Sequence, residues 1–257
     1  MSQAKERPIL FSGPMVRAIL EGRKTVTRRP VKGSQIPRLE YPDSPEPWIA
    51  VGQHHPRYGF VVHGKTEREC AVKVGELGAC PFGESGDRLW VREAWLADAQ
   101  LDSIAPRELS QGEPIMYPAD GNVRQTGCAM VSQGRGRPSI HMPRWASRIL
   151  LEITAVRVER LQDISDDQAK AEGMVYTDFG MQERPGKASI DGGKTFHPLK
   201  PQQAPGWHAG DATHPDQCLD RARWAFANLW EKINGEASWD ANPWVWVVEF
   251  KRVEPCA

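Results

Sequence analysis

The sequence lacks the features that mark secreted, metal-binding and membrane proteins. Its five cysteines are an odd number and none form a Cys-x-x-Cys pair, so neither a disulfide framework nor a tetrahedral zinc site is expected. No apolar run approaches the roughly 18 residues that a membrane-spanning helix needs. The amino-terminal residues carry no long apolar stretch of the kind found in a secretory signal. We therefore expect a cytoplasmic protein without membrane contact, metal or cofactor.

Net charge is also absent. Lys plus Arg and Asp plus Glu are 33 each, so no overall field draws the chain to nucleic acid, and such contact requires a local basic patch. Tyrosine is scarce, with 4 residues, whereas tryptophan reaches 10. That excess indicates either a Trp-rich core or flat surfaces that stack on ligands.

Hydrophobic periodicity and turn residues predict an α+β order of elements. Strands are expected at 8–12, 86–95, 147–161 and 242–253. Helices are expected at 14–22, 165–174 and 220–235. Caps support the helices, because Pro14 suits a first turn, Ser165 suits an N-cap, and glycines follow each helix.

Three stretches rich in glycine and proline separate these elements, at about 30–80, 98–138 and 177–216. They are expected to be irregular insertions, since regular elements lie on both sides of each. The chain is thus predicted to form a single domain over 1–257. A small curled β-sheet or barrel flanked by helices fits this order.

A basic stretch follows the first predicted helix. Residues 17–38 contain seven basic side chains and one acid, Glu21, with "EGRKTVTRR" at the centre. Such a stretch is compatible with a solvated surface that complements the helix dipole. It is also compatible with contact to phosphate or an RNA backbone.

The spacing within this stretch resembles a family signature. Gly22, Lys24, Thr27 and Arg29 form G-x-K-x-x-T-x-R, which is similar to the G-x-K-x-x-E-x-R pattern of the ASCH family, a branch of the PUA-like barrels. Threonine in place of glutamate is shared by a small amidohydrolase branch that acts on N4-acetylcytidine. The segments "GPMVRAILEGRKT", "GDRLWVREAW", "PSIHMPRWASRI", "LQDISDDQAKAEG" and "NPWVWVVEF" also resemble phage and prophage ASCH proteins, over most of the chain.

The resemblance implies three catalytic roles. Deacylation of an amide needs an activated attacking group, a stabilised oxyanion and a protonated leaving amine. Thr27 would be the nucleophile, Lys24 its base, and Glu172, in "ISDDQAKAEGM", the proton donor. A lysine serves as a base only when its pKa is lowered, and a nearby glutamate raises it. Either Glu172 is protonated in the working state, or it lies nearer the leaving nitrogen.

Five further residues are predicted to bind substrate. Arg23 and Arg29 belong to the basic stretch, and Arg92 lies on a predicted strand from which it can contact a carbonyl or phosphate. Arg144 lies in 135–148, where basic residues alternate with an aromatic, a pattern suited to nucleotides. Asn242 precedes Pro243 at the start of a strand, where its amide can contact a base edge or form a turn.

The predicted function is hydrolysis of an N4-acylated cytidine-type nucleoside. Two alternatives stay open: a non-catalytic module that binds RNA or a modified base, and a metal-independent ribonuclease that places Lys24 and arginines around a phosphate. The expected partner is therefore a modified nucleoside or RNA.

Overall fold

A five-stranded sheet forms the centre of the molecule. The computed structural model describes residues 4–55, 58–125, 127–183, 186–189 and 195–253. The strand order in the sheet is β1 (Glu6–Leu10), β6 (Arg88–Arg92), β9 (Leu150–Arg160), β14 (Trp244–Val253) and β2 (Val26–Pro30). Strands β1 and β6 are parallel, and the other neighbours are antiparallel. Strands from both ends of the chain thus build one sheet.

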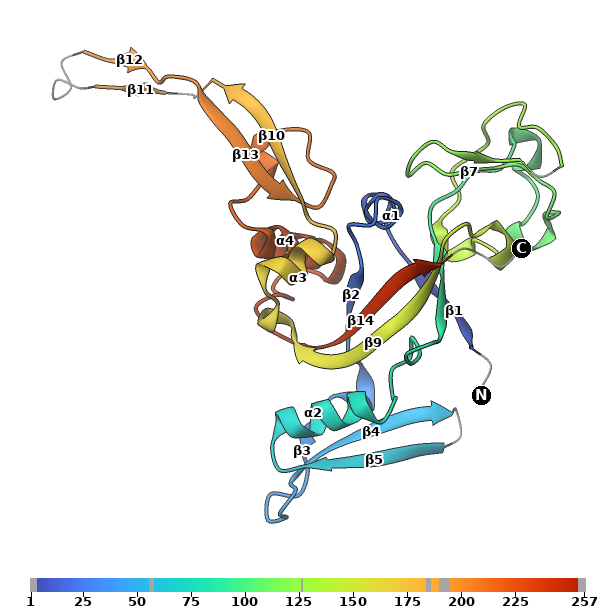
Figure 1. Cartoon of the computed structure of the whole chain (residues 1–257), viewed down its shortest axis with the longest axis vertical. Helices are drawn as coiled ribbons and strands as arrows, with labels where there is room; N and C mark the ends of the chain where they lie inside the picture. The colour runs from blue at the N-terminus through green and yellow to red at the C-terminus, as the bar shows by residue number, and fades with distance from the viewer. Residues whose placement is uncertain (1–3, 56–57, 126, 184–185, 190–194, 254–257) are drawn as a thin grey trace.

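The sheet is curled but open. Strands β9 and β14 are long and visibly curved (Figure 1), and their register shifts between Glu249 and Phe250, an irregularity that increases local twist. The mixed α+β class is confirmed. A closed barrel is not found, because in the described part of the chain the edge strands β1 and β2 do not pair. One side chain joins them instead: Arg29 Nη2 donates to the Leu10 carbonyl oxygen at 2.6 Å.

The predicted helices form at the expected places. These are α1 (Gly13–Leu20), α3 (Asp166–Ala171) and α4 (Ala222–Asn234). Ser165 Oγ accepts from the Gln168 amide in a capping box at the start of α3. Helices α3 and α4 lie together beside the ends of β9 and β14 (Figure 1).

The segment 30–80, predicted to be irregular, contains a second small sheet and a helix. Strands β3 (Arg38–Leu39), β4 (Trp48–His55) and β5 (Tyr58–Gly64) pair in that order. Helix α2 (Glu67–Glu76) begins at an N-cap, Thr66, and packs between this sheet and β9. The prediction was wrong because the prolines that suggested disorder lie mainly before β4, in the turns that lead to it.

The segment 177–216 was also wrongly predicted to be irregular. Strand β10 (Val175–Gln182) pairs with β13 (Gln202–His208), and β11 (Lys187–Ala188) pairs with β12 (His197–Pro198). Together they form an arm that projects from the body of the molecule (Figure 1). The sequence stretch carries little alternation, because an arm with two exposed faces has no buried side to specify it.

The segment 98–138 is largely irregular, as predicted. Its strands are the short pair β7 (Ile115–Met116) and β8 (Val123–Arg124). The loops fold around a small apolar cluster of their own, which includes Trp95, Ile115 and Tyr117. Burial of these side chains gives the loops a defined structure.

Tryptophan side chains contribute to the main core. Trp244 and Trp246 of β14 and Trp230 of α4 are buried, so at these positions the Trp-rich sequence indicates packing and not an exposed stacking surface. No helix in the described part of the chain is long and apolar enough to cross a membrane.

Candidate functional site

A cavity of about 430 Å³ lies between the two edge strands of the sheet and helix α4. Its charged and hydroxyl side chains include Lys24, Thr27, Arg28, Arg29 and Glu172, and its apolar walls include Phe11, Met15, Phe226 and Trp230. A cavity of this size with mostly apolar walls and a few convergent polar groups is typical of small-molecule sites. It is the first candidate for the functional site.

Lys24 and Arg28 are the two buried cations that line this cavity. The Lys24 ammonium donates to Glu172 Oε2 at 2.7 Å, to the Glu172 carbonyl at 2.8 Å and to the Val26 carbonyl at 2.9 Å. Burial lowers the pKa of Lys24, and Arg29 and Arg28 act in the same direction, while the Glu172 carboxylate opposes them. The net direction is downward, as the role of a base requires.

Glu172 reaches the cavity because helix α3 ends there. It is the C-cap residue of α3, and Gly173 turns the chain with φ +102°. A Cβ at Gly173 would lie 3.0 Å from Ala18 Cβ and 3.4 Å from Lys24 Cβ. Only glycine both adopts this conformation easily and leaves room for the Lys24 stem.

Arg28 completes the buried charge cluster. Its Nη1 lies 3.3 Å from Glu172 Oε1, and its Nη2 lies 3.3 Å from Glu159 Oε2. From the sequence, Arg28 was expected only to add to the positive field around Lys24, together with Arg23 and Arg29. Residues 17–38 contain only one acid, so a cation buried there requires a carboxylate from a distant segment. This imbalance is the sequence feature that indicates the Arg28 ion pairs.

Thr27 and Arg29 are carried by β2 at the rim of the same cavity. Thr27 is 3% exposed, and its hydroxyl makes no hydrogen bond to any residue that the structure describes. Arg29 lies over the Phe11 ring at 5.3 Å. Burial lowers the pKa of Arg29, and Glu172 opposes the shift. The Thr27 hydroxyl thus lacks a hydrogen-bond partner among the described residues and belongs to a residue that lines a cavity with three cations.

The other predicted residues do not line this cavity. Arg23 donates to the Gly173 carbonyl at 3.0 Å and supports the end of α3. Arg92 lines an adjoining cavity and stacks on Trp90. Arg144 forms an ion pair with Glu6 at 2.8 Å. Thus the structure brings Lys24, Thr27, Arg29 and Glu172 together and places the remaining predictions elsewhere.

Asn242 holds a turn. Its Oδ1 accepts from the Gln162 amide at 2.8 Å, its carbonyl accepts from Arg160 Nη1 at 3.0 Å, and its φ is +42°. Asparagine tolerates this conformation better than most residues. The base-edge role that the sequence suggested is replaced by the turn-forming one.

The basic stretch 135–148 also serves structure. The Arg137 guanidinium donates to the Leu101 and Ile104 carbonyls at 2.6 and 2.9 Å. Arg148 makes paired hydrogen bonds to Glu93, each at 2.9 Å. Because these guanidinium groups are hydrogen-bonded within the protein, the stretch offers less positive charge to nucleic acid than its composition suggests.

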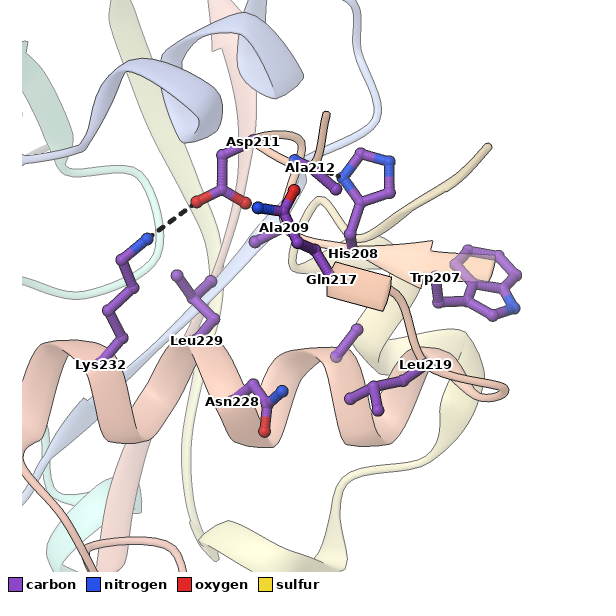
Figure 2. Close-up of a pocket in the computed structure, with 11 residues that line it drawn as sticks. Trp207, His208, Ala209, Asp211, Ala212, Gln217, Leu219, Asn228, Leu229 and Lys232 are labelled. Carbon is purple, nitrogen blue, oxygen red and sulfur yellow. Dashed lines mark hydrogen bonds and ion pairs between the residues drawn. The ribbon is translucent and has the colours of Figure 1, made fainter. Parts of the chain in front are cut away.

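A smaller pocket, of about 230 Å³, lies away from the main cavity, between the base of the arm and α4 (Figure 2). His208 lines it, but its Nδ1 accepts from the Gly210 amide at 2.9 Å and its Nε2 shares a hydrogen bond of 2.8 Å with Thr177 Oγ1. Asp211 and Lys232 form an ion pair at 2.9 Å in the same pocket (Figure 2). The ring nitrogens of His208 are occupied, so this pocket offers no free base.

Metal ligands do not gather in the described part of the chain. No cluster of at least three His, Cys, Asp or Glu side chains with suitable geometry occurs there. No family model matches the chain, and neither a curated protein nor a solved structure matches it. The chemistry of the cavity must therefore be inferred from its own residues.

Proposed function

We propose that the protein is an amidohydrolase that deacylates an N4-acetylcytidine-type nucleoside, and that its sheet and helices are an ASCH variant of the PUA-like fold. One observation carries this proposal. Lys24 and Glu172, which are 148 residues apart, meet at 2.7 Å in the cavity that Thr27 also lines. A lysine, a glutamate and a hydroxyl are the groups that this reaction needs.

The lysine–glutamate contact supports a simple proton arrangement. Transfer of one proton from Lys24 Nζ to Glu172 Oε2 produces a neutral amine and a neutral carboxyl group. Burial favours the neutral amine of Lys24, whose pKa it lowers. The same transfer makes Lys24 a base and Glu172 an acid, which resolves the opposing demands that the sequence posed.

Acyl transfer then follows in balanced steps. The Thr27 hydroxyl oxygen attacks the acetyl carbon and gives its proton to Lys24. The Arg29 guanidinium stabilises the oxyanion that forms. When the carbon–nitrogen bond breaks, Glu172 gives its proton to N4 and cytidine leaves. The enzyme now holds an acetyl ester on Thr27, a charged Lys24 and an ionised Glu172.

Deacylation returns the site to its starting state. A water molecule gives a proton to the Glu172 carboxylate as its oxygen attacks the ester carbon. The ester bond breaks, the Thr27 oxygen recovers a proton from Lys24, and acetic acid is released. Lys24 and Glu172 are neutral again, so no metal or cofactor is required by this route.

Chromatography of N4-acetylcytidine incubated with the protein tests the proposal. We expect cytidine and acetate from the wild type, and a rate lower by about 10²–10⁴-fold in Glu172→Gln because general acid–base transfer contributes that much. Glu159→Gln is the matched control, since Glu159 also pairs with Arg28 but does not line the cavity. No cytidine from a folded wild type, or equal losses in both variants, contradicts the proposal.

A non-catalytic module for modified bases is the second candidate, and one observation favours it. The three protons of the Lys24 ammonium are directed to Glu172 and Val26 oxygens, and Lys24 makes no hydrogen bond to Thr27 in the described structure. In that arrangement the cavity binds a base by its apolar walls and by Thr27 and Arg29. Such a module predicts saturable binding of N4-acetylcytidine without cytidine formation.

A further inference from the structure

A second cavity adjoins the proposed active site. It has a volume of about 530 Å³ and shares Leu10, Arg29, Pro30 and Asn234 with the first cavity. The Arg29–Leu10 hydrogen bond between the sheet edges therefore lies where the two cavities meet. The two cavities are therefore neighbours that share a wall at Arg29.

The charge in the second cavity has one sign. Arg29, Lys32 and Arg92 line it, and none of its described lining residues is an aspartate or glutamate. This differs from the first cavity, where Glu172 contacts Lys24 and Arg28. Cations gathered without a carboxylate raise the local potential and favour an anionic ligand.

Buried donors in this cavity lack partners. Arg29 Nε, Arg92 Nε and Trp246 Nε1 are buried, and none has a hydrogen-bond partner in the described part of the chain. Trp246 is 0% exposed, and it lies opposite Arg29 in the β14–β2 register. Unpaired buried N–H groups are costly and uncommon in folded proteins. Because these three atoms are enclosed, a ligand would reach Arg92 through its outer guanidinium nitrogens, which make no hydrogen bond within the described part of the chain and are not enclosed.

We propose that the second cavity binds the phosphate group of a nucleotide whose cytosine-type base lies in the first cavity. The identity of the base rests on the proposed function, whereas the phosphate site rests on the three cations and on the absence of a carboxylate among the described lining residues. Guanidinium groups bind phosphate oxygens in paired hydrogen bonds, and an ammonium adds a point charge. The substrate class is then a phosphorylated nucleoside or a nucleic acid strand, in preference to a free nucleoside.

Calorimetric titration with unmodified ligands tests this without any turnover. Cytidine, cytidine monophosphates bearing a 5′- or a 3′-phosphate, and a short cytidine oligonucleotide are titrated into the wild type, Arg92→Gln, Lys32→Gln and Lys251→Gln. Lys251 is the charge-matched control, since its side chain is 59% exposed and pairs with Glu152. We expect one phosphate position to tighten wild-type binding by about tenfold or more.

The ratio of the affinity for the preferred monophosphate to the affinity for cytidine should fall toward one in Arg92→Gln and decrease in Lys32→Gln. It should stay at the wild-type value in Lys251→Gln. A monophosphate that binds as tightly as the oligonucleotide identifies a nucleotide as the source, and stronger binding of the oligonucleotide identifies a strand. Equal binding of cytidine and both monophosphates, a gain that survives in Arg92→Gln and Lys32→Gln, or no binding at all overturns the inference. Absence of N4-acetylcytidine hydrolysis alongside a phosphate gain contradicts only the proposed function.

Discussion

Individual buried charges explain most of the chemistry in the main cavity. The side chains of Lys24 and Glu172 are 2% and 3% exposed, and Arg28 adds a second cation to the same carboxylate. Water screens these charges little, and burial is the main cause of the lowered pKa of Lys24. A lysine placed in this way differs chemically from the surface lysines of the same chain.

Lowering the pH should reduce the stability of the protein through His208, at the base of the arm. Burial lowers the pKa of His208, and Arg23 adds to the shift while Asp211 opposes it. Below the ordinary histidine value of about 6.5, the unfolded chain binds a proton that the native ring resists, so stability falls as the pH falls. We expect unfolding free energy to decrease between pH 7.5 and 5.5 by up to roughly 1 kcal/mol more in wild type than in His208→Gln.

Urea titrations at both pH values measure this difference. Equal pH responses of the wild type and His208→Gln would show that His208 is not the sensitive group. The comparison between the two proteins removes the contribution of all other titrating side chains, because these are common to both.

At the scale of elements, the end of helix α3 positions Glu172 against Lys24. Gly173→Ala should lower stability and reduce turnover, because its φ of +102° is strained for alanine and the new Cβ would press on Ala18 and on the Lys24 stem. Gly235→Ala is the control, since Gly235 ends α4 with φ +101° and has nothing within 4 Å of an added Cβ. We expect about 1–3 kcal/mol from backbone strain in the control and a further 1–3 kcal/mol, roughly, from crowding at Gly173.

Thermal unfolding together with the cytidine-release assay separates these effects. Gly235→Ala should keep its activity at temperatures where it is folded, whereas Gly173→Ala should lose activity even when folded. Equal losses of stability and unchanged activity in both variants would contradict the role assigned to Gly173.

Elements with local signals were predictable from the sequence. The capping box at Ser165, the Pro14 start of α1 and the alternation in β9 and β14 depend on neighbouring residues, and all of these elements form. The β3–β5 sheet was missed because prolines dominate the segment before it. The β10–β13 arm was missed because its strands bury little and therefore alternate weakly.

Long-range partners were harder to predict. The meeting of Lys24 with Glu172 was expected only from a family resemblance, and the pairing of Arg28 with Glu172 and Glu159 was not expected at all. Ion pairs between distant segments leave no spacing pattern in a single sequence. Asn242 and Arg144 lie outside the main cavity, and Gln162 and Glu6 contact them from elsewhere in the chain.

At the scale of the whole molecule, the candidate functional region lies between the edge strands β1 and β2 of the open sheet. Strands β1 and β2 face each other across a gap that Arg29 spans, and both proposed binding cavities include residues of these edges. A closed barrel would pair the edges and remove this space. The open sheet therefore supplies the site, while α1, α3 and α4 supply its walls and charges.

The central claim is that the Thr27 hydroxyl is the nucleophile, and the rate of cytidine release from N4-acetylcytidine by Thr27→Val and Thr27→Ser tests it most directly. Valine keeps the shape of threonine without a hydroxyl, and serine keeps the hydroxyl without the methyl group. The account predicts no detectable release by a folded Thr27→Val and measurable release by Thr27→Ser. Release by Thr27→Val at the wild-type rate would contradict it.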